Sequence, residues 1–419
     1  MPVNFNIQSG SPAGNPLDND SISAMLFLTT YVGANVWRSY KATSAADAIA
    51  WLGIDDVDLE LKANQYIEDY YALAGDGAIL FLGIMTDYAL PLAIDIDVET
   101  AARVMQLSQD ATTQGFTLRQ MAVVIHGDML GAYNTTPGIG CGFRDDLGLV
   151  VSALLTQNNN GALRKKPIVY LLEGDCFGTS LGDLGAVIDP ALLLGGQAPS
   201  GAGVCISLID TKFQPAAPNY RFHIGAALGN MAKLPCYYNI GGHQQGNIIG
   251  ILAVQSQPVW AATAYPVATD ESKWELLSQT GLLFATKEKE SEMFFFDDKG
   301  VGSIPSLAHC KTTFKAKRLL YDAYSAWQNE PLALKGDGTM RGTTLAQYRG
   351  IGNDVLTTVA ADKPSSMLGR GEISSAKIII DPAQKPSINN NHVLIDFELQ
   401  LLGFAHTISG TIFIKQAIQ

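Results

Sequence analysis

The feature that most constrains this chain is an alternation of helical and strand-like segments between residues 43 and 210. Amphipathic helical patterns at 44–54 and 66–75 precede a continuous apolar run at 78–84, and a helical pattern at 98–114 precedes the run at 121–126. Apolar runs of this length are typical of strands buried on both faces. Strands that alternate with helices build a mainly parallel sheet with helices on both sides. The sequence therefore predicts an α/β fold here.

The same alternation continues downstream. A helical pattern at 147–157 leads to a strand at 167–173, and a glycine-rich loop leads to a strand at 203–210. At 419 residues the chain exceeds the size at which a single hydrophobic core stops growing. We therefore expect two or three domains.

The pattern changes after Asp270. Residues 280–298 read as two strands around a charged turn, which predicts an antiparallel hairpin and a new domain. Two helices and then three strands are predicted to follow, at 309–327, 345–360, 376–381, 393–401 and 411–415. We expect the second helix to open with a capping box formed by Thr344 and Gln347.

Both ends of the chain carry strand patterns that cannot fold alone. Val3, Phe5 and Ile7 alternate with polar residues, which is the period of a strand with one buried face. The turn-rich stretch Ser9–Asp20 follows and predicts a loop or flexible arm. The last strand comprises Thr411, Ile412, Phe413, Ile414 and Lys415. Because an isolated strand leaves its backbone groups unpaired, we expect both ends to pair with neighbouring copies.

The composition argues against several kinds of partner. The formal net charge of −12 and a pI of about 4.9 would repel a phosphate backbone, so no nucleic acid is expected. No apolar run is long enough to span a bilayer, and the first residues lack the pattern of a signal peptide, so we expect no membrane insertion and folding in a cytoplasm. The five cysteines are scattered and contain no C-x-x-C pair, which favours reduced core thiols.

The strongest candidate for catalysis is Gly178–Gly182, which matches the G-x-S-x-G pattern of a nucleophile elbow with Ser180 as the nucleophile. Asp210 and His223 follow in the chain order of a hydrolase triad. However, the elbow needs its serine directly at the end of a strand, and Glu173–Phe177 intervene. We therefore favour a glycine-rich loop, and a serine hydrolase remains the alternative.

Other motifs that resemble binding sites lack an essential residue. Gly138–Phe143 lacks the third glycine of a dinucleotide loop, and residues 336–344 lack the Gly-Lys-Ser/Thr end of a phosphate loop, so we expect a surface turn there. The histidines never show the i, i+4 spacing of a helical metal pair. Paired acids such as Asp297 and Asp298 lie beside predicted turns, where aspartate is common. The sequence predicts no cofactor, no metal and no enzymatic activity.

The helix predicted at 309–327 has two distinct faces. Its apolar stripe comprises Ala316, Leu319, Leu320, Ala323 and Trp327. Lys311, Lys315 and Arg318 lie on the opposite face. In so acidic a chain, this basic strip is a candidate docking face for an acidic partner, although a solvated face is the default interpretation.

Several segments, taken in order, resemble the contractile tail sheath proteins of bacteriophages and related injection machines, in a divergent prophage branch. Residues 44–54 and 66–84 resemble the early helix, second helix and strand of that family, and residues 222–248 resemble a segment before its last domain. The C-terminal third is the most similar, with the hairpin at 280–298, the basic helix, residues 367–382 and a final strand pair. The resemblance covers nearly the whole chain.

This resemblance implies a structural subunit that assembles into stacked six-fold rings as a helical sheath. The sheath surrounds an inner tail tube protein, and contracts to drive the tube through a target envelope. Terminal arms add strands to sheets of neighbouring subunits. The implied partners are further copies, the tube protein, and baseplate and tail terminator proteins. The implied location is a virion tail, assembled in the bacterial host cytoplasm.

The resemblance also implies a multidomain α/β and α+β architecture, in which an assembly domain built from both chain ends, with extended terminal β arms, carries an inserted α/β sheet domain. The expected parts are an N-terminal arm and strand at 1–28, a small α/β segment at 29–95, an inserted outer domain at 96–274, a C-terminal assembly domain at 275–408 and a strand arm at 409–419. Lys311, Lys315 and Arg318 become candidates for contact with the tube. A capsid or baseplate protein is a further alternative.

Overall fold

The structure, a computed structural model, falls into two compact units. We call Met1–Pro331 the α/β unit and Leu332–Gln419 the C-terminal unit. The residues that the structure describes are 20–30, 36–52, 57–87, 95–125, 146–159, 163, 166–176, 204–210, 224–242, 282–283, 285–289, 292–295, 297–298, 300, 306–327, 330–358, 366–386 and 393–403.

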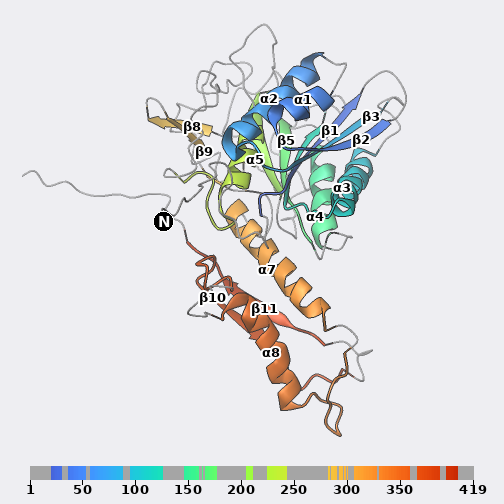
Figure 1. The fold of residues 1–419 in the computed structure, drawn as a ribbon, viewed down its shortest axis with the longest axis vertical. Coiled ribbons are helices and arrows are strands. Elements are labelled where there is room, and N and C mark those ends of the chain that lie inside the picture. Colours follow the sequence, from blue (N-terminus) through green and yellow to red (C-terminus); the bar gives the residue numbers. More distant parts are fainter. Residues whose placement is uncertain are drawn as a thin grey trace, which may run out of the picture. The chain divides into compact units, whose positions relative to one another are not determined.

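A sheet of seven described strands forms the centre of the α/β unit (Figure 1). In chain order these strands are β1 (Ser23–Thr30), β2 (Val36–Ala42), β3 (Leu80–Asp87), β4 (Gln120–Ile125), β5 (Val169–Cys176), β6 (Val204–Asp210) and β7 (Leu282–Leu283). Their order across the sheet is β2-β3-β1-β4-β5-β6-β7, and all neighbours are parallel except β2 and β3. The chain therefore winds outward in both directions from β1. The predicted, mainly parallel sheet is confirmed.

Helices cover both faces of this sheet, as predicted. One face carries α1 (Ala45–Leu52), α2 (Val57–Ala74) and α5 (Ile224–Lys233), and the other carries α3 (Ile96–Thr113) and α4 (Leu147–Asn159). Alternate residues of β1 pack against the helices on the two faces of the sheet, because successive side chains of a strand point to opposite faces. Met25 and Phe27 pack with the first group of helices, and Leu26 and Leu28 with the second. The α/β unit therefore has two hydrophobic cores that share one sheet.

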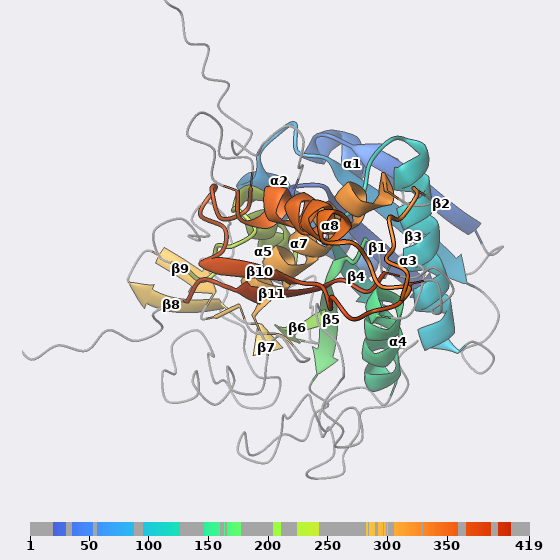
Figure 2. The same ribbon diagram turned by 90° about the horizontal axis from the view of Figure 1, so that it is seen from below.

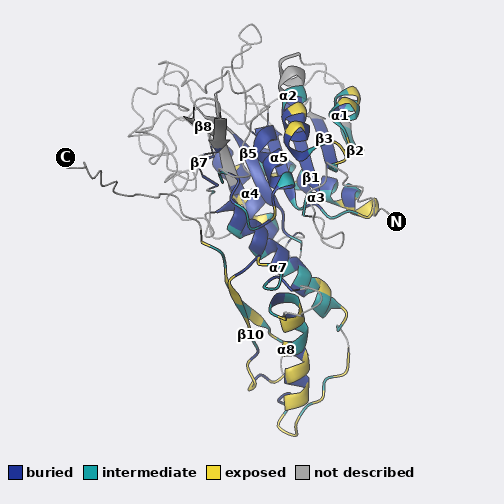
Figure 3. Cartoon of the chain, turned by 60° about the vertical axis from the view of Figure 1, so that its left-hand side comes forward, coloured by how far each residue is buried: buried dark blue, intermediate teal, exposed yellow. Residues whose placement is uncertain are grey.

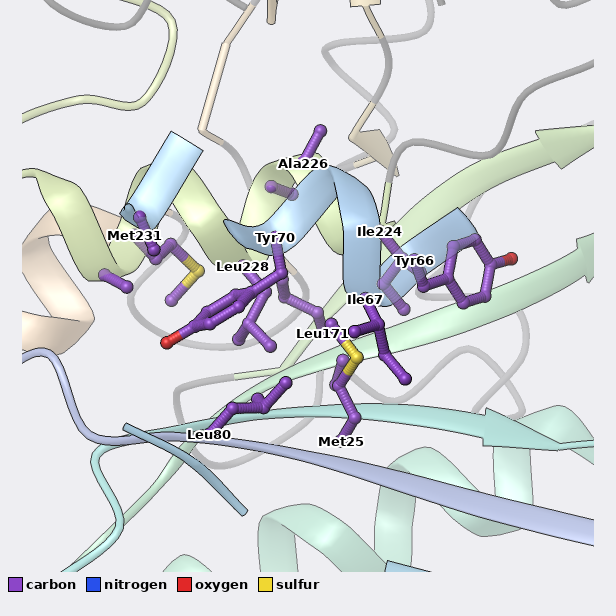
Figure 4. Packing of buried hydrophobic residues seen from close by; sticks show 14 of the residues in the cluster. Met25, Tyr66, Ile67, Tyr70, Leu80, Leu171, Ile224, Ala226, Leu228 and Met231 are labelled. Atoms are coloured by element: carbon purple, nitrogen blue, oxygen red, sulfur yellow. The ribbon is translucent and has the colours of Figure 1, made fainter. Parts of the chain in front are cut away.

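Two helices of the first face, α2 and α5, approach closely at glycines. A Cβ atom on Gly225 would lie 2.2 Å from the carbonyl oxygen of Tyr66, and one on Gly229 would lie 2.8 Å from that of Tyr70. Figure 4 shows both tyrosine side chains among the core residues of α5 and the sheet. The buried Tyr66 hydroxyl donates to Glu173 Oε1 of β5 at 3.2 Å. Glycine at these two positions thus sets the distance between the helices.

The α/β unit ends with a hairpin and a long helix. Strands β8 (Ala285–Lys289) and β9 (Glu292–Phe295) pair antiparallel, which confirms the predicted hairpin. Helix α7 (Leu307–Ser325) follows, and Leu307, Cys310 and Phe314 extend the core of the first face. The half of α7 that begins at Leu307 is mostly buried, whereas the other half is more exposed (Figure 3).

The C-terminal unit is much smaller. Helix α8 (Gly342–Leu356) packs on β10 (Ser375–Ile379), which pairs antiparallel with β11 (Asp396–Gln400) (Figure 2). A tight turn precedes α8, in which Lys335 N–H donates to the carbonyl oxygen of Thr339 at 2.7 Å. The surface turn predicted from this glycine-rich stretch is therefore confirmed.

The central sheet extends across two of the expected domain limits. Strand β1, from which the sheet winds outward, spans the expected limit between residues 28 and 29. At the other end, β7 continues the same sheet beyond residue 275, and the compact α/β unit extends to Pro331. The strand β1 was missed because its partners β3 and β4 lie far away in sequence, so no local pattern marks it as central.

The predicted capping box is wrong. The N-cap of α8 is Arg341, so the helix begins earlier than expected and Thr344 lies inside its first turn. The Thr344 hydroxyl instead donates to the carbonyl oxygen of Ala333 at 3.2 Å. The hydroxyl thus makes a tertiary hydrogen bond in place of the local capping bond that the sequence pattern favours.

Candidate functional site

The residues proposed for catalysis are not brought together in the described part of the chain. Ser180, His223 and Gly138–Phe143 lie outside the described residues, and Asp210 is the last residue of β6. Among the described residues, no group of three or more His, Cys, Asp or Glu side chains could hold a metal ion. The described helices also include none that is long and apolar enough to cross a membrane.

The most unusual polar feature is the basic face of α7. The residues Lys311, Lys315 and Arg318 are only 4–6% exposed. The Lys315 ammonium donates to Asp20 Oδ2 at 2.6 Å, and an Arg318 nitrogen lies 3.5 Å from Asp20 Oδ1. Arg318 also donates to the carbonyl oxygen of Pro167 at 3.4 Å. The basic face is thus bonded to distant parts of the same unit.

Lys311 extends this pattern to the end of α5. Its ammonium donates to the carbonyl oxygen of Met231 at 2.6 Å and lies 3.5 Å from that of Leu234. The last carbonyl groups of a helix have no partner within the helix and carry partial negative charge. A lysine from α7 therefore satisfies the C-terminal end of α5.

The positions of these partners explain why α7 is basic. Asp20 precedes β1 and Pro167 precedes β5, so both lie where parallel strands of the sheet begin. In a β-α-β unit the helix runs back along the sheet, so helices end at this same edge. Three cations spaced along one face of α7 therefore meet carbonyl oxygens and a carboxylate at one edge of the sheet.

Burial and charge shift two pKa values in this cluster. Burial by itself would raise the pKa of Asp20, but the charges of Lys315 and Arg318 outweigh it and hold that pKa below its ordinary value. Burial lowers the pKa of Lys311 to about 8, and Cys236 and Asp20 oppose this shift in part. Asp20 is therefore stabilised as a carboxylate, whereas charged Lys311 is disfavoured by its surroundings.

The expectation that Lys311, Lys315 and Arg318 form an exposed basic strip is therefore corrected. The sequence placed the three residues on one face, which the structure bears out, but that face points into the α/β unit. An amphipathic pattern cannot reveal that carbonyl oxygens and Asp20 lie at the sheet edge, where they bond these three side chains. Asp20 itself was treated as the end of a loop, and no local signal links it to Lys315, 295 positions later.

A second polar cluster holds the start of α7. Asp298 Oδ2 accepts from Ala308 N–H at 2.9 Å and from the Ser306 hydroxyl at 3.0 Å. The neighbouring Asp297 accepts from Asn239 at 3.4 Å. Burial raises the pKa of Asp298 to about 6, an effect that the bond from Ala308 opposes and the charge of Asp297 reinforces. The acid pair that the sequence assigned to a turn is buried, and Asp298 supports the N-cap residue Ser306 at the start of α7.

The sheet of the C-terminal unit has two described strands. Among the described strands, β10 and β11 pair only with each other, so each has one open edge. Register pairs Ile378 with Phe397 on one face of the sheet. Ile378 is buried beneath α8, but Phe397 and Leu399 of β11 are only half-buried, and Leu394 just before β11 is 66% exposed. Among the described residues, the apolar row of Phe397 and Leu399 is therefore only partly covered.

The opposite face of β11 is polar. Asp396, Glu398 and Gln400 are exposed and alternate with the half-buried residues. Glu398 lies directly across from Lys377 of β10, which is an opposite-charge pair. The sheet thus has one apolar and one polar face up to its open edge. The strand residues proposed to pair with neighbours, Val3, Phe5, Ile7 and Thr411 to Lys415, lie outside the described residues.

The fold has counterparts among solved structures. One is a chain from the six-fold symmetrised baseplate of the anti-feeding prophage, with a TM-score of 0.56 and 10% identity over 99% of this chain and 98% of that chain. Another comes from the contracted sheath complex of PVC, an extracellular contractile injection system, with a TM-score of 0.52 and 10% identity over 99% and 97% of the two chains. The contracted helical sheath of the anti-feeding prophage gives a TM-score of 0.50 and 12% identity over 99% of both.

These similarities extend over almost the full length of each chain. At such low identity they establish a shared fold, and the resemblance to contractile sheath proteins is confirmed at that level. No protein-family model and no curated protein matches the sequence.

Proposed function

We propose that this chain is a structural subunit of a contractile sheath, which polymerises around an inner tube and contracts to drive that tube through a target envelope. The proposal rests on the fold shared with chains of contractile sheath and baseplate assemblies. In this role the chain performs no chemistry. The energy for contraction is stored in contacts between subunits.

The observation that carries the proposal is the open edge of β11 among the described strands of the C-terminal unit. An open strand edge is a template for pairing with a further strand. The side chains of Phe397 and Leu399, which form the apolar row, are only half-buried. A strand added along β11 would bond its backbone and cover this row.

The chain's own terminal segments have the required pattern. Val3, Phe5 and Ile7 alternate with Asn4, Asn6 and Gln8, as a strand needs when one of its faces is apolar and the other polar. We therefore propose that terminal strands of neighbouring copies complete the sheet of each C-terminal unit. Such links join copies into stacked six-fold rings, with the tube, baseplate and terminator proteins as further partners, in a virion tail or a related machine.

Electron microscopy of the purified full-length protein tests this function directly. We expect hollow helical tubes or stacked six-fold rings. A monodisperse compact monomer at high concentration would count decisively against a sheath. Because one counterpart comes from a baseplate, a baseplate component is the second candidate. It would give single rings that never extend into tubes.

Deleting either end tests the strand links. Removing residues 1–10, or the strand from Thr411 onward, should leave a folded α/β unit with a cooperative unfolding transition. Neither variant should form tubes, because each lacks one strand that joins the copies. Tubes that form without either end would show that the linking role assigned to these strands is wrong.

A further inference from the structure

The residues just before β1 are held by defined contacts within the α/β unit. Asp20 is the first described residue, and its backbone leads within three residues into β1. Ser23 N–H donates to the carbonyl oxygen of Ile79, and Arg119 N–H donates to that of Ile22. Ile22 and Ser23, where β1 starts, are therefore held by the sheet. Asp20 is held by the side chains of Lys315 and Arg318.

Those side chains belong to α7, which is the last helix before the C-terminal unit. Lys315 and Arg318 both reach Asp20 and are almost fully buried. Arg318 and Lys311 also bond carbonyl groups at Pro167 and at the end of α5. Helix α7 is therefore tied to the sheet at several points, and Asp20 is one of them.

We propose that Asp20, Lys315 and Arg318 form an anchor that positions the N-terminal segment for pairing with a neighbouring copy and passes load on that segment to α7. This inference rests on the proposed strand exchange and names the internal contact that supports it. Without the anchor, a pull on the segment would act on the first residues of β1 alone. With it, the load also reaches α7.

The ion pair suits this role better than an apolar contact would. Apolar contacts are non-directional, whereas an ion pair fixes the positions of its charged groups. Removing one partner of a buried pair leaves an uncompensated charge, so the contact resists being opened. An anchor that fixes the end of the N-terminal arm next to β1 lowers the ordering cost of pairing, because one end of the arm is already held when the copies meet.

The test compares assembly with folding in the full-length chain. Asp20→Asn should raise the critical concentration for tube formation roughly tenfold, equivalent to about 1.4 kcal/mol. Glu99→Gln is the matched control, because it removes a carboxylate that lies 2.6 Å from Arg103 on α3. The control should leave the critical concentration unchanged. Sedimentation of tubes measures the concentration, and thermal unfolding below it reports whether each variant is folded.

A charge swap separates an anchor from a purely structural contact. Asp20→Lys and Lys315→Glu should each impair assembly, and the double variant should restore it because the ion pair is reformed with opposite polarity. The swap also keeps the test decisive if Asp20→Asn fails to fold. A folded Asp20→Asn variant that assembles at the wild-type concentration, or a folded swap variant that does not regain assembly, would overturn the proposal.

A second measurement works without any assembly. In the monomer, Asp20→Asn should increase amide hydrogen exchange at residues 20–22, and Glu99→Gln should not. If the wild-type protein forms no tubes, the proposed sheath function fails while this measurement still reports on the anchor. Unchanged exchange at residues 20–22 in the Asp20→Asn variant would overturn the anchor even if tubes form.

Discussion

The two units of this chain use strands in opposite ways. In the α/β unit, the strands next to β1 have strand neighbours on both sides and helices on both faces, and Phe27 of β1 is completely buried. In the C-terminal unit, β11 has one strand neighbour among the described residues, and Phe397 near its middle is half-buried. The strands at the centre of the first sheet are thus enclosed within the chain, whereas β11 is an edge strand among the described residues. The proposed function assigns folding stability to the first sheet and association to the second.

The largest expected effect separates these two phenylalanines. Phe27→Ala should lower the free energy of unfolding by about 3–5 kcal/mol, because it empties a filled core position. Phe397→Ala should lower the free energy of unfolding of the monomer by about 1 kcal/mol or less, because Phe397 is only half-buried. The same change should prevent tube formation, because the added strand would pack on the Phe397 side chain. Urea unfolding and electron microscopy of both variants provide the measurements. Normal tubes from Phe397→Ala would remove the distinction between the two sheets.

The next comparison uses one glycine from each unit. Gly225→Ala should cost about 3 kcal/mol, because its Cβ would lie 2.2 Å from a backbone oxygen of α2. Gly350→Ala in α8 should instead stabilise by about 0.5–1 kcal/mol, because nothing lies within 4 Å and alanine favours the helix. Thermal unfolding of both variants measures the effects. Equal destabilisation would mean that the C-terminal unit is as tightly packed as the α/β unit.

A smaller effect concerns the buried charge of Lys311. Its pKa falls from 10.5 to about 8 in the folded chain, so the cost of burying the ammonium is fully present below pH 8. That cost disappears as pH rises to 10.5, where the unfolded chain also loses the proton. Relative to Lys311→Met, the wild-type unfolding free energy should therefore rise across this window, by on the order of 2–3 kcal/mol. Urea unfolding at pH 8 and pH 10 checks it. If the difference in unfolding free energy between the wild type and Lys311→Met is the same at both pH values, burial does not disfavour the charged form of Lys311.

The smallest expected effect is at the start of α7. Asp298 has a pKa raised from 3.8 to about 6, and it faces Asp297 and His309 as its charged neighbours. Because the folded chain takes up a proton before the unfolded chain does, stability should increase as pH falls from 6 to 3.8. Relative to Asp298→Asn, we expect an increase on the order of 1–2 kcal/mol. Denaturation at pH 7 and pH 5 measures it, and a decrease at pH 5 would contradict the assignment.

Sequence prediction succeeded for elements that local patterns define and failed for elements that depend on contacts with distant residues. The α/β alternation, the hairpin after Asp270 and helices α7 and α8 were predicted because hydrophobic periodicity is a local signal. Gly75, where the second helix was expected to end, has φ of +83° just after α2, as a helix-ending glycine should. Strands β1 and β2 were missed, because their place in the sheet depends on partners far along the chain.

The candidate site shows the same limit more sharply. The sequence placed Lys311, Lys315 and Arg318 on one helical face, and such a face is usually solvated. Burial of that face depends on Asp20, Pro167 and the end of α5, which only the folded chain brings together. The open edge of β11 is similar, since an alternating strand does not reveal how many partners it has.

The sequence by itself determined that this chain is a mainly parallel α/β protein with a different C-terminal part, because helix and strand periods are written into consecutive residues. From strand patterns at both ends it also predicted pairing with a partner, because a strand cannot satisfy its own backbone. Only the tertiary structure decided which strand is central, where the units divide and which way the basic face of α7 points. These features depend on which groups, distant in sequence, pair with a buried charge or a strand edge. The pattern of consecutive residues does not contain that information.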